Sequence, residues 1–194
     1  FANPANRASD IAVDSGGHKV LAFDPEGQKK MEFGQRGSGG GQFNFPTHIA
    51  VDRDGQVYVS DSLNFRIQVF HPDGQFVTKF GSVGNVVGTF SKPKGIAVDR
   101  EGHIYVVDGL YDTVQVFNMQ GELLMNFGSS GNEEGRFWLP AGIFADIKDR
   151  IYVADTYNHR VQVFEYLGQA SGSASDWPLS QHEPPQINGT EEKK

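Results

Sequence analysis

The chain has 194 residues, with 17 Lys and Arg against 24 Asp and Glu, no Cys, and a formal net charge of −7. Its hydrophobic content of 38%, with 15 Phe, 6 Tyr and 2 Trp, is enough for a packed core and argues against global disorder. No apolar run approaches the roughly 18 residues of a membrane-spanning helix, and the lack of Cys excludes disulfides and thiolate metal sites. The acidic balance disfavours nucleic acid as a partner.

A fixed repeat of 47 residues organises the chain. Several residues keep this spacing: Asp52, Asp99 and Asp146; Asp61, Asp108 and Asp155; Phe70, Phe117 and Phe164; and Pro46, Pro93 and Pro140. A constant period of this length is typical of folds in which each unit packs on its neighbours. The copies lie near residues 1–34, 45–81, 92–128 and 139–167, and together they predict one repeat domain over residues 1–168.

The first copy is shortened, and its start can be read in two ways. Ile11 to Asp14 resembles the first strand of the next copy, Ile49 to Asp52. The same residues can equally be the second strand of a repeat, because Asp14 lies 47 residues before Asp61. Both readings stay open from the sequence.

The second copy shows the pattern of one complete unit. Four runs of β-branched and aromatic residues, at 49–52, 57–60, 66–70 and 76–80, are separated by turn signals such as Asp54-Gly55 and Asp73-Gly74. The third copy keeps the same turns, and helical periodicity is absent. Four antiparallel strands in a unit that cannot bury both sheet faces alone predict an all-β fold, a β-propeller of four-stranded blades.

The last copy stops after its third strand. Residues 169–194 differ in composition, being rich in Ser, Gly, Pro and Gln, and are expected to form a flexible C-terminal tail. Within this tail Trp177, followed by Pro178 and Leu179, is a candidate contact to a partner or back to the propeller.

The repeated residues resemble the NHL repeat. The resemblance rests on P-x-G-I-A-V-D, on D-G-x-I-Y-V-x-D, and on the run Asn158 to Phe164, which reads N-H-R-V-Q-V-F. It implies a propeller of usually six blades, whereas about four units are visible. We therefore expect further N-terminal sequence in the complete protein, including a strand that closes the ring. The family includes protein-binding scaffolds, RNA-binding domains and a metal-dependent lyase.

The turns between the second and third strands differ between copies while the strands do not. They form a candidate partner-binding face, whose residues are Leu63, Phe65, Leu110, Tyr111, Tyr157 and His159. Apolar and aromatic side chains gathered on one face are typical of a contact surface. The alternative is that these side chains pack on the neighbouring blade.

Basic residues follow the same turns. Arg66 and Arg160, with Lys19 at the equivalent position, are expected to pair with Asp61, Asp155 and Asp14 or to bind turn carbonyls. This role is structural.

His48 is the exception among the histidines, because it lies on a predicted first strand where the other copies have Gly95 and Gly142. It is a candidate channel residue. One histidine does not make a metal site, which needs about three protein ligands, so no metal and no cofactor is predicted.

We interpret the chain as a non-catalytic binding or scaffolding propeller within a larger assembly, with another protein chain as partner. The alternative, implied by the resemblance, is a lyase or lactone hydrolase with a metal in the propeller channel, held by His48 and residues of further blades. The family resemblance also suggests a periplasmic or extracellular location.

Overall fold

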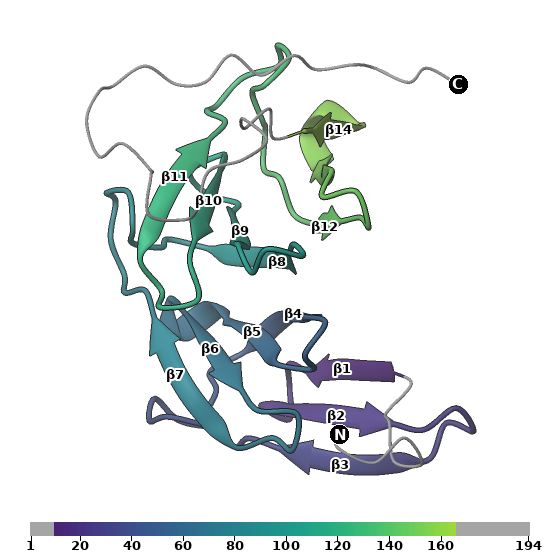
Figure 1. Cartoon of the computed structure of the whole chain (residues 1–194). Coiled ribbons are helices and arrows are strands. Elements are labelled where there is room, and N and C mark those ends of the chain that lie inside the picture. The colour runs from purple at the N-terminus through teal and green to yellow at the C-terminus, as the bar shows by residue number, and fades with distance from the viewer. Residues whose placement is uncertain (1–9, 166–194) are drawn as a thin grey trace.

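The computed structural model describes residues 10–165. Its strands form four antiparallel sheets that follow one another along the chain. The sheets lie side by side in an arc, with β4, β8 and β12 on the inner side and β3, β7 and β11 on the outer side (Figure 1). Among the described residues no helix is long and apolar enough to cross a membrane.

Each sheet is one blade, and its strands pair in chain order. Blade 1 contains β1 (Asp10–Asp14), β2 (Lys19–Phe23) and β3 (Lys29–Phe33). Blade 2 contains β4 (Pro46–Val51), β5 (Val57–Asp61), β6 (Arg66–Phe70) and β7 (Phe76–Phe80). Blade 3 contains β8 (Pro93–Val98), β9 (Ile104–Asp108), β10 (Thr113–Phe117) and β11 (Leu123–Phe127). Blade 4 contains β12 (Ile143–Ala145), β13 (Ile151–Asp155) and β14 (Arg160–Phe164). The predicted all-β propeller of 47-residue blades is confirmed.

The structure decides between the two readings of the first copy. β1 ends at Asp14 and pairs with β2, just as β5 ends at Asp61 and pairs with β6. β1 therefore occupies the second strand position of the repeat, and the reading of residues 11–14 as an inner strand is wrong. The reason is the strand register: Asp14 is paired with Lys19 across β1 and β2, as Asp61 is paired with Arg66 across β5 and β6.

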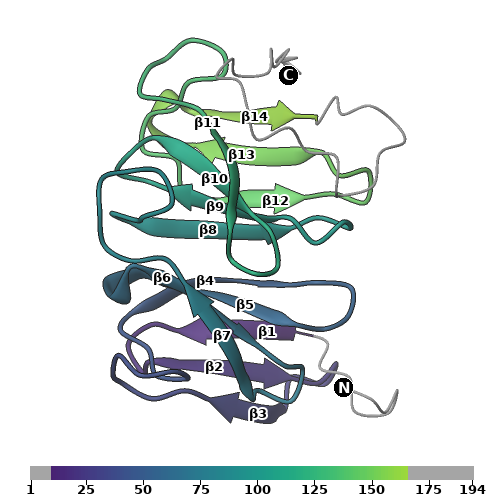
Figure 2. The ribbon, with the colours of Figure 1, turned by 60° about the vertical axis from the view of Figure 1, so that its left-hand side comes forward.

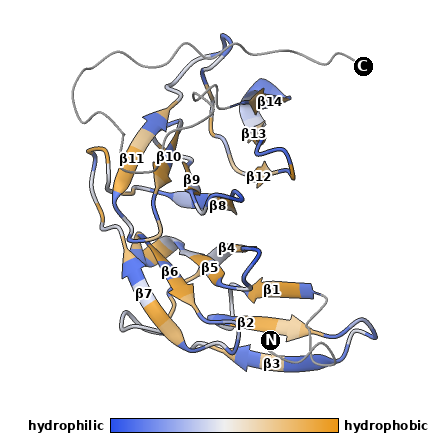
Figure 3. Ribbon diagram, in the orientation of Figure 1, coloured by the Kyte–Doolittle hydropathy of each residue, from blue (hydrophilic) through white to orange (hydrophobic). Residues whose placement is uncertain are grey.

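The core lies between the blades. Three phenylalanines meet at each interface: at the interface of blades 2 and 3, the Phe117 ring lies 4.9 Å from Phe80 and 5.6 Å from Phe90. The same cluster recurs as Phe33, Phe43 and Phe70, and as Phe127, Phe137 and Phe164. Orange marks β1, β5 and β6, whose side chains fill these interfaces, whereas β3 is mostly blue (Figure 3).

A glycine is required beside each of these clusters. Gly81 has a φ of +91°, and a Cβ there would overlap the Phe90 ring. Gly34 and Gly128 stand in the same relation to Phe43 and Phe137. The left-handed backbone lets the inter-blade loop begin over the ring.

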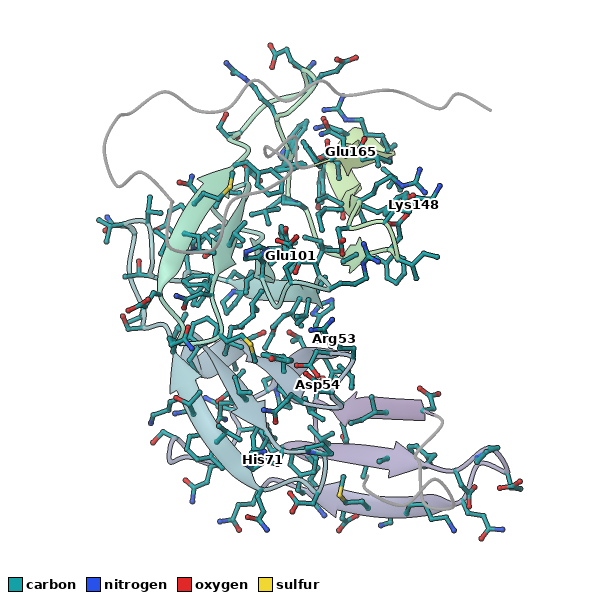
Figure 4. The ribbon with its side chains drawn as sticks, in the orientation of Figure 1. Arg53, Asp54, His71, Glu101, Lys148 and Glu165 are labelled. Atoms are coloured by element: carbon teal, nitrogen blue, oxygen red, sulfur yellow. The ribbon has the colours of Figure 1, made fainter. Side chains whose placement is uncertain are left out.

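An aspartate closes the turn between the first and second strands. The Asp52 carboxylate accepts bonds from the amides of Asp54 and Gln56, both at 2.9 Å, and from the Tyr58 hydroxyl at 2.9 Å. Asp99 and Asp146 repeat this arrangement. The same turns present charged side chains to solvent, among them Arg53, Asp54, Glu101 and Lys148 (Figure 4).

One face of blade 4 is uncovered by the described residues, at one end of the stack (Figure 2). Val161 is 62% exposed, whereas its equivalents Ile67 and Val114 are fully buried against the following blade. Phe144 and Ile147, also on this face, are 63% and 83% exposed. Blade 4 therefore differs from the interior blades 2 and 3 in its cover as well as in having three described strands instead of four.

Matched truncations at Val114 and Val161 test where the core lies. Val114→Ala is expected to lower the free energy of unfolding by about 2 kcal/mol, because it deletes two buried methyl groups and leaves a cavity. Val161→Ala is expected to change it by less than about 0.5 kcal/mol, because that side chain is mostly exposed. Urea denaturation followed by circular dichroism measures both. Equal losses at the two positions would contradict an inter-blade core.

Candidate functional site

One end of the blades, here termed the loop face, is formed by the turns at residues 62–65, 109–112 and 156–159 and by the loops between blades. Each turn is tied to the loop that enters its own blade. The Leu63 amide donates to the Asn44 carbonyl at 3.0 Å, and the Tyr157 amide donates to the Trp138 carbonyl at 3.0 Å. In blade 3 the Gly109 amide donates to the Lys92 carbonyl at 3.1 Å. The backbone of the loop face is therefore fixed.

The turns hold apolar side chains out in solvent. Ser62–Asn64 and Thr156–Asn158 are single 3₁₀ turns, and each ends at a residue with left-handed backbone, Phe65 and His159, both with φ of 54°. The middle residue of each turn projects outward: Leu63 is 53% exposed and Tyr157 is 55% exposed. In blade 3, Leu110 and Tyr111 are 56% and 40% exposed.

The remaining two predicted residues of the partner-binding face, Phe65 and His159, differ in burial. Phe65 is half-buried and packs against the core between blades 2 and 3, which is the arrangement that the alternative interpretation describes. His159 is exposed. At the same repeat position His18 and Asp112 accept hydrogen bonds from the next blade, from the Phe45 amide at 3.1 Å and the Leu139 amide at 2.7 Å. Trp177 lies outside the described residues.

Sequence reasoning missed Trp138. It is 52% exposed and its ring centre lies 5.7 Å from that of Tyr157. The equivalent residues, Asn44 and Ser91, are polar, so a tryptophan at a polar repeat position was the available signal. The loop into blade 3 adds further apolar surface, since Val83, Val86 and Val87 are 67%, 66% and 55% exposed.

An arginine beneath the loop face holds the loop between blades 1 and 2. Arg66 is buried, and its Nε donates to the Asp61 carboxylate at 2.8 Å. Its terminal nitrogens donate to the carbonyls of Ser38 at 2.7 Å, and of Gly39 and Gln42 at 2.8 Å. The predicted Arg66–Asp61 pair is confirmed. We term this arrangement the arginine clamp.

The clamp recurs in blade 4 but not in blades 1 and 3. Arg160 donates to Asp155 at 2.8 Å and to the Glu133 and Arg136 carbonyls. Lys19, however, pairs with Glu32 at 3.2 Å on the neighbouring strand β3, so the predicted Lys19–Asp14 pair is wrong.

Blade 3 has a different network at this position. Thr113 replaces the arginine, and Asp108, which is fully buried, accepts instead from the backbone amides of Ser91, Lys92 and Leu110. The loop into blade 3 is thus the one that carries exposed valines and has no arginine beneath it.

His48 lies on the inner strand β4, opposite Ser60 of β5. Its Nδ1 is buried and has no hydrogen-bond partner among the described residues. Burial lowers the pKa of His48, and the nearby charge of Lys94 lowers it further. Residues 10–165 contain no group of three His, Asp or Glu side chains that could hold a metal ion.

Comparison with known families and structures identifies the repeat. The NHL repeat pattern matches residues 43–70 and 137–164. The two matched segments contain the clamp arginines, Arg66 and Arg160, whereas the equivalent residues of blades 1 and 3 are Lys19 and Thr113. A comparison with curated protein sequences finds no match.

Solved β-propellers share the fold at low identity. A catalytically inactive virginiamycin B lyase from Staphylococcus aureus, crystallised with quinupristin, is 16% identical, with a TM-score of 0.61 over 84% of this chain and 51% of that one. A gluconolactonase from Xanthomonas campestris is 20% identical, with a TM-score of 0.59 over 80% of this chain and 54% of that one. The WD40 repeats of RRP9 are 17% identical, with a TM-score of 0.58 over 76% of this chain and 42% of that one. The chain thus spans about half the length of these proteins.

Removal of the clamp tests its contribution to stability. Arg66→Ala is expected to cost about 3 kcal/mol, because it leaves the buried Asp61 carboxylate without its cation. Thr113→Ala, at the equivalent position of blade 3, removes a single hydrogen bond to the Phe127 carbonyl and is expected to cost about 1 kcal/mol. Urea denaturation of both variants measures the difference. If both variants lost the same free energy of unfolding, the arginine clamp would not stabilise its blade more than Thr113 stabilises blade 3.

Proposed function

We propose that this chain, whose NHL repeats form blades of a β-propeller, is a platform that binds another protein chain through its loop face and performs no catalysis of its own. One observation carries the proposal: three blades expose an apolar residue at the tip of the same turn. These residues are Leu63, Leu110 and Tyr157, each between 53% and 56% exposed.

The positions of these side chains argue against chance exposure. Isolated apolar residues on a surface need no explanation, but several that gather on one face mark interaction sites. Trp138 and Tyr157 form an exposed aromatic pair, and tryptophan and tyrosine are enriched among the residues that dominate binding energy. The loop face therefore has the composition of a protein contact surface.

In blades 2 and 4 the loop face is also held in place beneath its exposed side chains. The arginine clamps of blades 2 and 4 bind the loop carbonyls, and the turn amides bind the loops as well. A preorganised surface loses little conformational entropy on binding. The fixed backbone supports a binding surface that exists before the partner arrives, rather than a loop that becomes ordered on binding.

Blade 3 lies between blades 2 and 4, and its turn and entering loop expose five apolar residues: Leu110, Tyr111, Val83, Val86 and Val87. In blade 2, the Asn64 side chain donates to the Gly37 carbonyl at 2.8 Å. Tyr111 and Gly84 occupy the repeat positions of Asn64 and Gly37, and the exposed valines belong to the same loop as Gly84. We place the centre of the contact here, on Leu110, Tyr111, Val86 and Val87.

A metal-dependent lyase or lactone hydrolase is the second candidate, and the unpartnered Nδ1 of His48 favours it. Its metal would need ligands from outside residues 10–165, since no group of three lies within them. The charge of Lys94 beside His48 acts against a divalent cation. Elemental analysis separates the two functions: a stoichiometric metal that is lost in His48→Ala would favour the enzyme.

A triple substitution on the loop face tests the platform. Leu63→Ser, Leu110→Ser and Tyr157→Ser together are expected to weaken partner binding at least about 100-fold, because each removes about 1 kcal/mol or more of contact energy. The partner is first identified by cross-linking and mass spectrometry in periplasmic and extracellular fractions of the source cells, where we propose that the protein acts. The affinity of the purified pair is then measured by calorimetry.

The matched control is Val51→Ser, Val77→Ser and Met119→Ser, which changes three residues that are 44%, 39% and 46% exposed and lie outside the loop face. It is expected to retain full affinity. Unchanged binding by the loop-face variant, or equal loss in the control, would show that the partner binds elsewhere.

A further inference from the structure

The inner strands β4 and β8 lie side by side (Figure 1), and three basic residues lie on them or directly beside them. His48 is on β4, Lys94 is on β8, and Lys92 immediately precedes β8. Ser60, the register partner of His48, donates to the Lys94 carbonyl at 2.6 Å and so fixes the two strands together. The charges act on each other: after burial, which is the main cause, Lys94 lowers the pKa of His48 and Lys92 lowers the pKa of Lys94.

None of these three side chains has a hydrogen bond or an ion pair with any described residue. By contrast, the lysines of blade 1 are paired with carboxylates: Lys19 and Lys29 with Glu32, and Lys30 with Asp24. Lys94 is half-buried, and a desolvated cation is costly unless it is paired. The positive charge of the cluster is therefore not neutralised by any described residue.

The blade itself does not require these residues. The equivalents of His48 are Gly95 and Gly142, those of Lys94 are Thr47 and Ala141, and those of Lys92 are Phe45 and Leu139. Residues that the repeat needs for folding, such as the turn aspartates, recur in successive copies. All three members of the cluster instead depart from their equivalents, and they do so at one place on the inner side of the arc.

The buried Nδ1 of His48 points to the same conclusion. A buried polar atom without a partner costs about 1–3 kcal/mol, and such atoms in native proteins commonly mark a bound water, ion or ligand. A cation would be repelled by Lys94. An anion would satisfy the lysines and would accept a hydrogen bond from Nε2 of His48, because Nδ1 is covered by protein atoms.

We propose that His48, Lys92 and Lys94 form a binding site for a small oxyanion, a carboxylate or a phosphate, on the inner side of the arc. The two lysines supply charge, and a ring N–H of His48 supplies one directed hydrogen bond. The site adjoins the loop face, because the Lys92 carbonyl accepts from the Gly109 amide of the blade 3 turn. Its side chains are nevertheless different from the three tips that we propose to bind a protein partner.

Titration of the purified chain with citrate and with inorganic phosphate tests the site, using sodium chloride at equal ionic strength as reference. The readouts are calorimetry and the ¹⁵N resonances of the His48 imidazole. We expect saturable shifts of these resonances and a rise in the pKa of His48 on binding, since a bound anion favours the protonated ring. Saturation by citrate alone would identify a carboxylate site, and saturation by phosphate alone a phosphate site.

Lys94→Met and Lys92→Met remove the charges but keep most of each side chain, and each is expected to weaken binding at least about tenfold. Lys148→Met is the control, because Lys148 is exposed and lies on a turn of blade 4; it is expected to bind like the wild type. Circular dichroism confirms that the variants are folded. Linear shifts that match those in sodium chloride, or equal affinity in all variants, would overturn the proposal.

Discussion

A propeller blade has two apolar faces and cannot bury either of them alone, and the rest of this structure depends on that constraint. The burial of Ile67 and Tyr58 of blade 2 requires Phe90, Ile104 and Phe117 of blade 3. The same three-phenylalanine cluster therefore forms at each described interface, and a glycine stands beside it where the chain crosses to the next blade. Stability is in this sense a property of pairs of blades.

Most of the fold could be predicted because its determinants recur. Asp52, Asp99 and Asp146 each close a turn, and their fixed spacing alone gave the blade boundaries. Prediction failed where a copy was changed. Ile11 to Asp14 fits two strand positions in sequence, and the choice between them needed the pairing of Asp14 with Lys19. Lys19 does not form the expected ion pair with Asp14, because it pairs with Glu32 on the adjacent strand β3.

The candidate sites show the opposite pattern, since they consist of the residues that do not recur. Leu63, Leu110 and Tyr157 could be identified from variable turns between constant strands. Trp138 was missed because it lies in the loop that enters blade 4 and not in one of these turns, although the polar residues at its equivalent positions, Asn44 and Ser91, marked it as exceptional. His48 was marked by the glycines at its equivalent positions, but its neighbours Lys92 and Lys94 became relevant only when β4 and β8 were placed side by side.

The face of blade 4 that residues 10–165 leave uncovered bears on how such an array changes in evolution. Phe144 occupies the position of Ala97, which is 5% exposed and closely packed between blades 3 and 4. A copy of blade 4 stacked on this face would meet a phenyl ring where its own fold provides room for a methyl group. Gene duplication can therefore lengthen the array by copying an interior unit such as residues 92–138, but a unit appended after blade 4 would need a compensating change at Phe144.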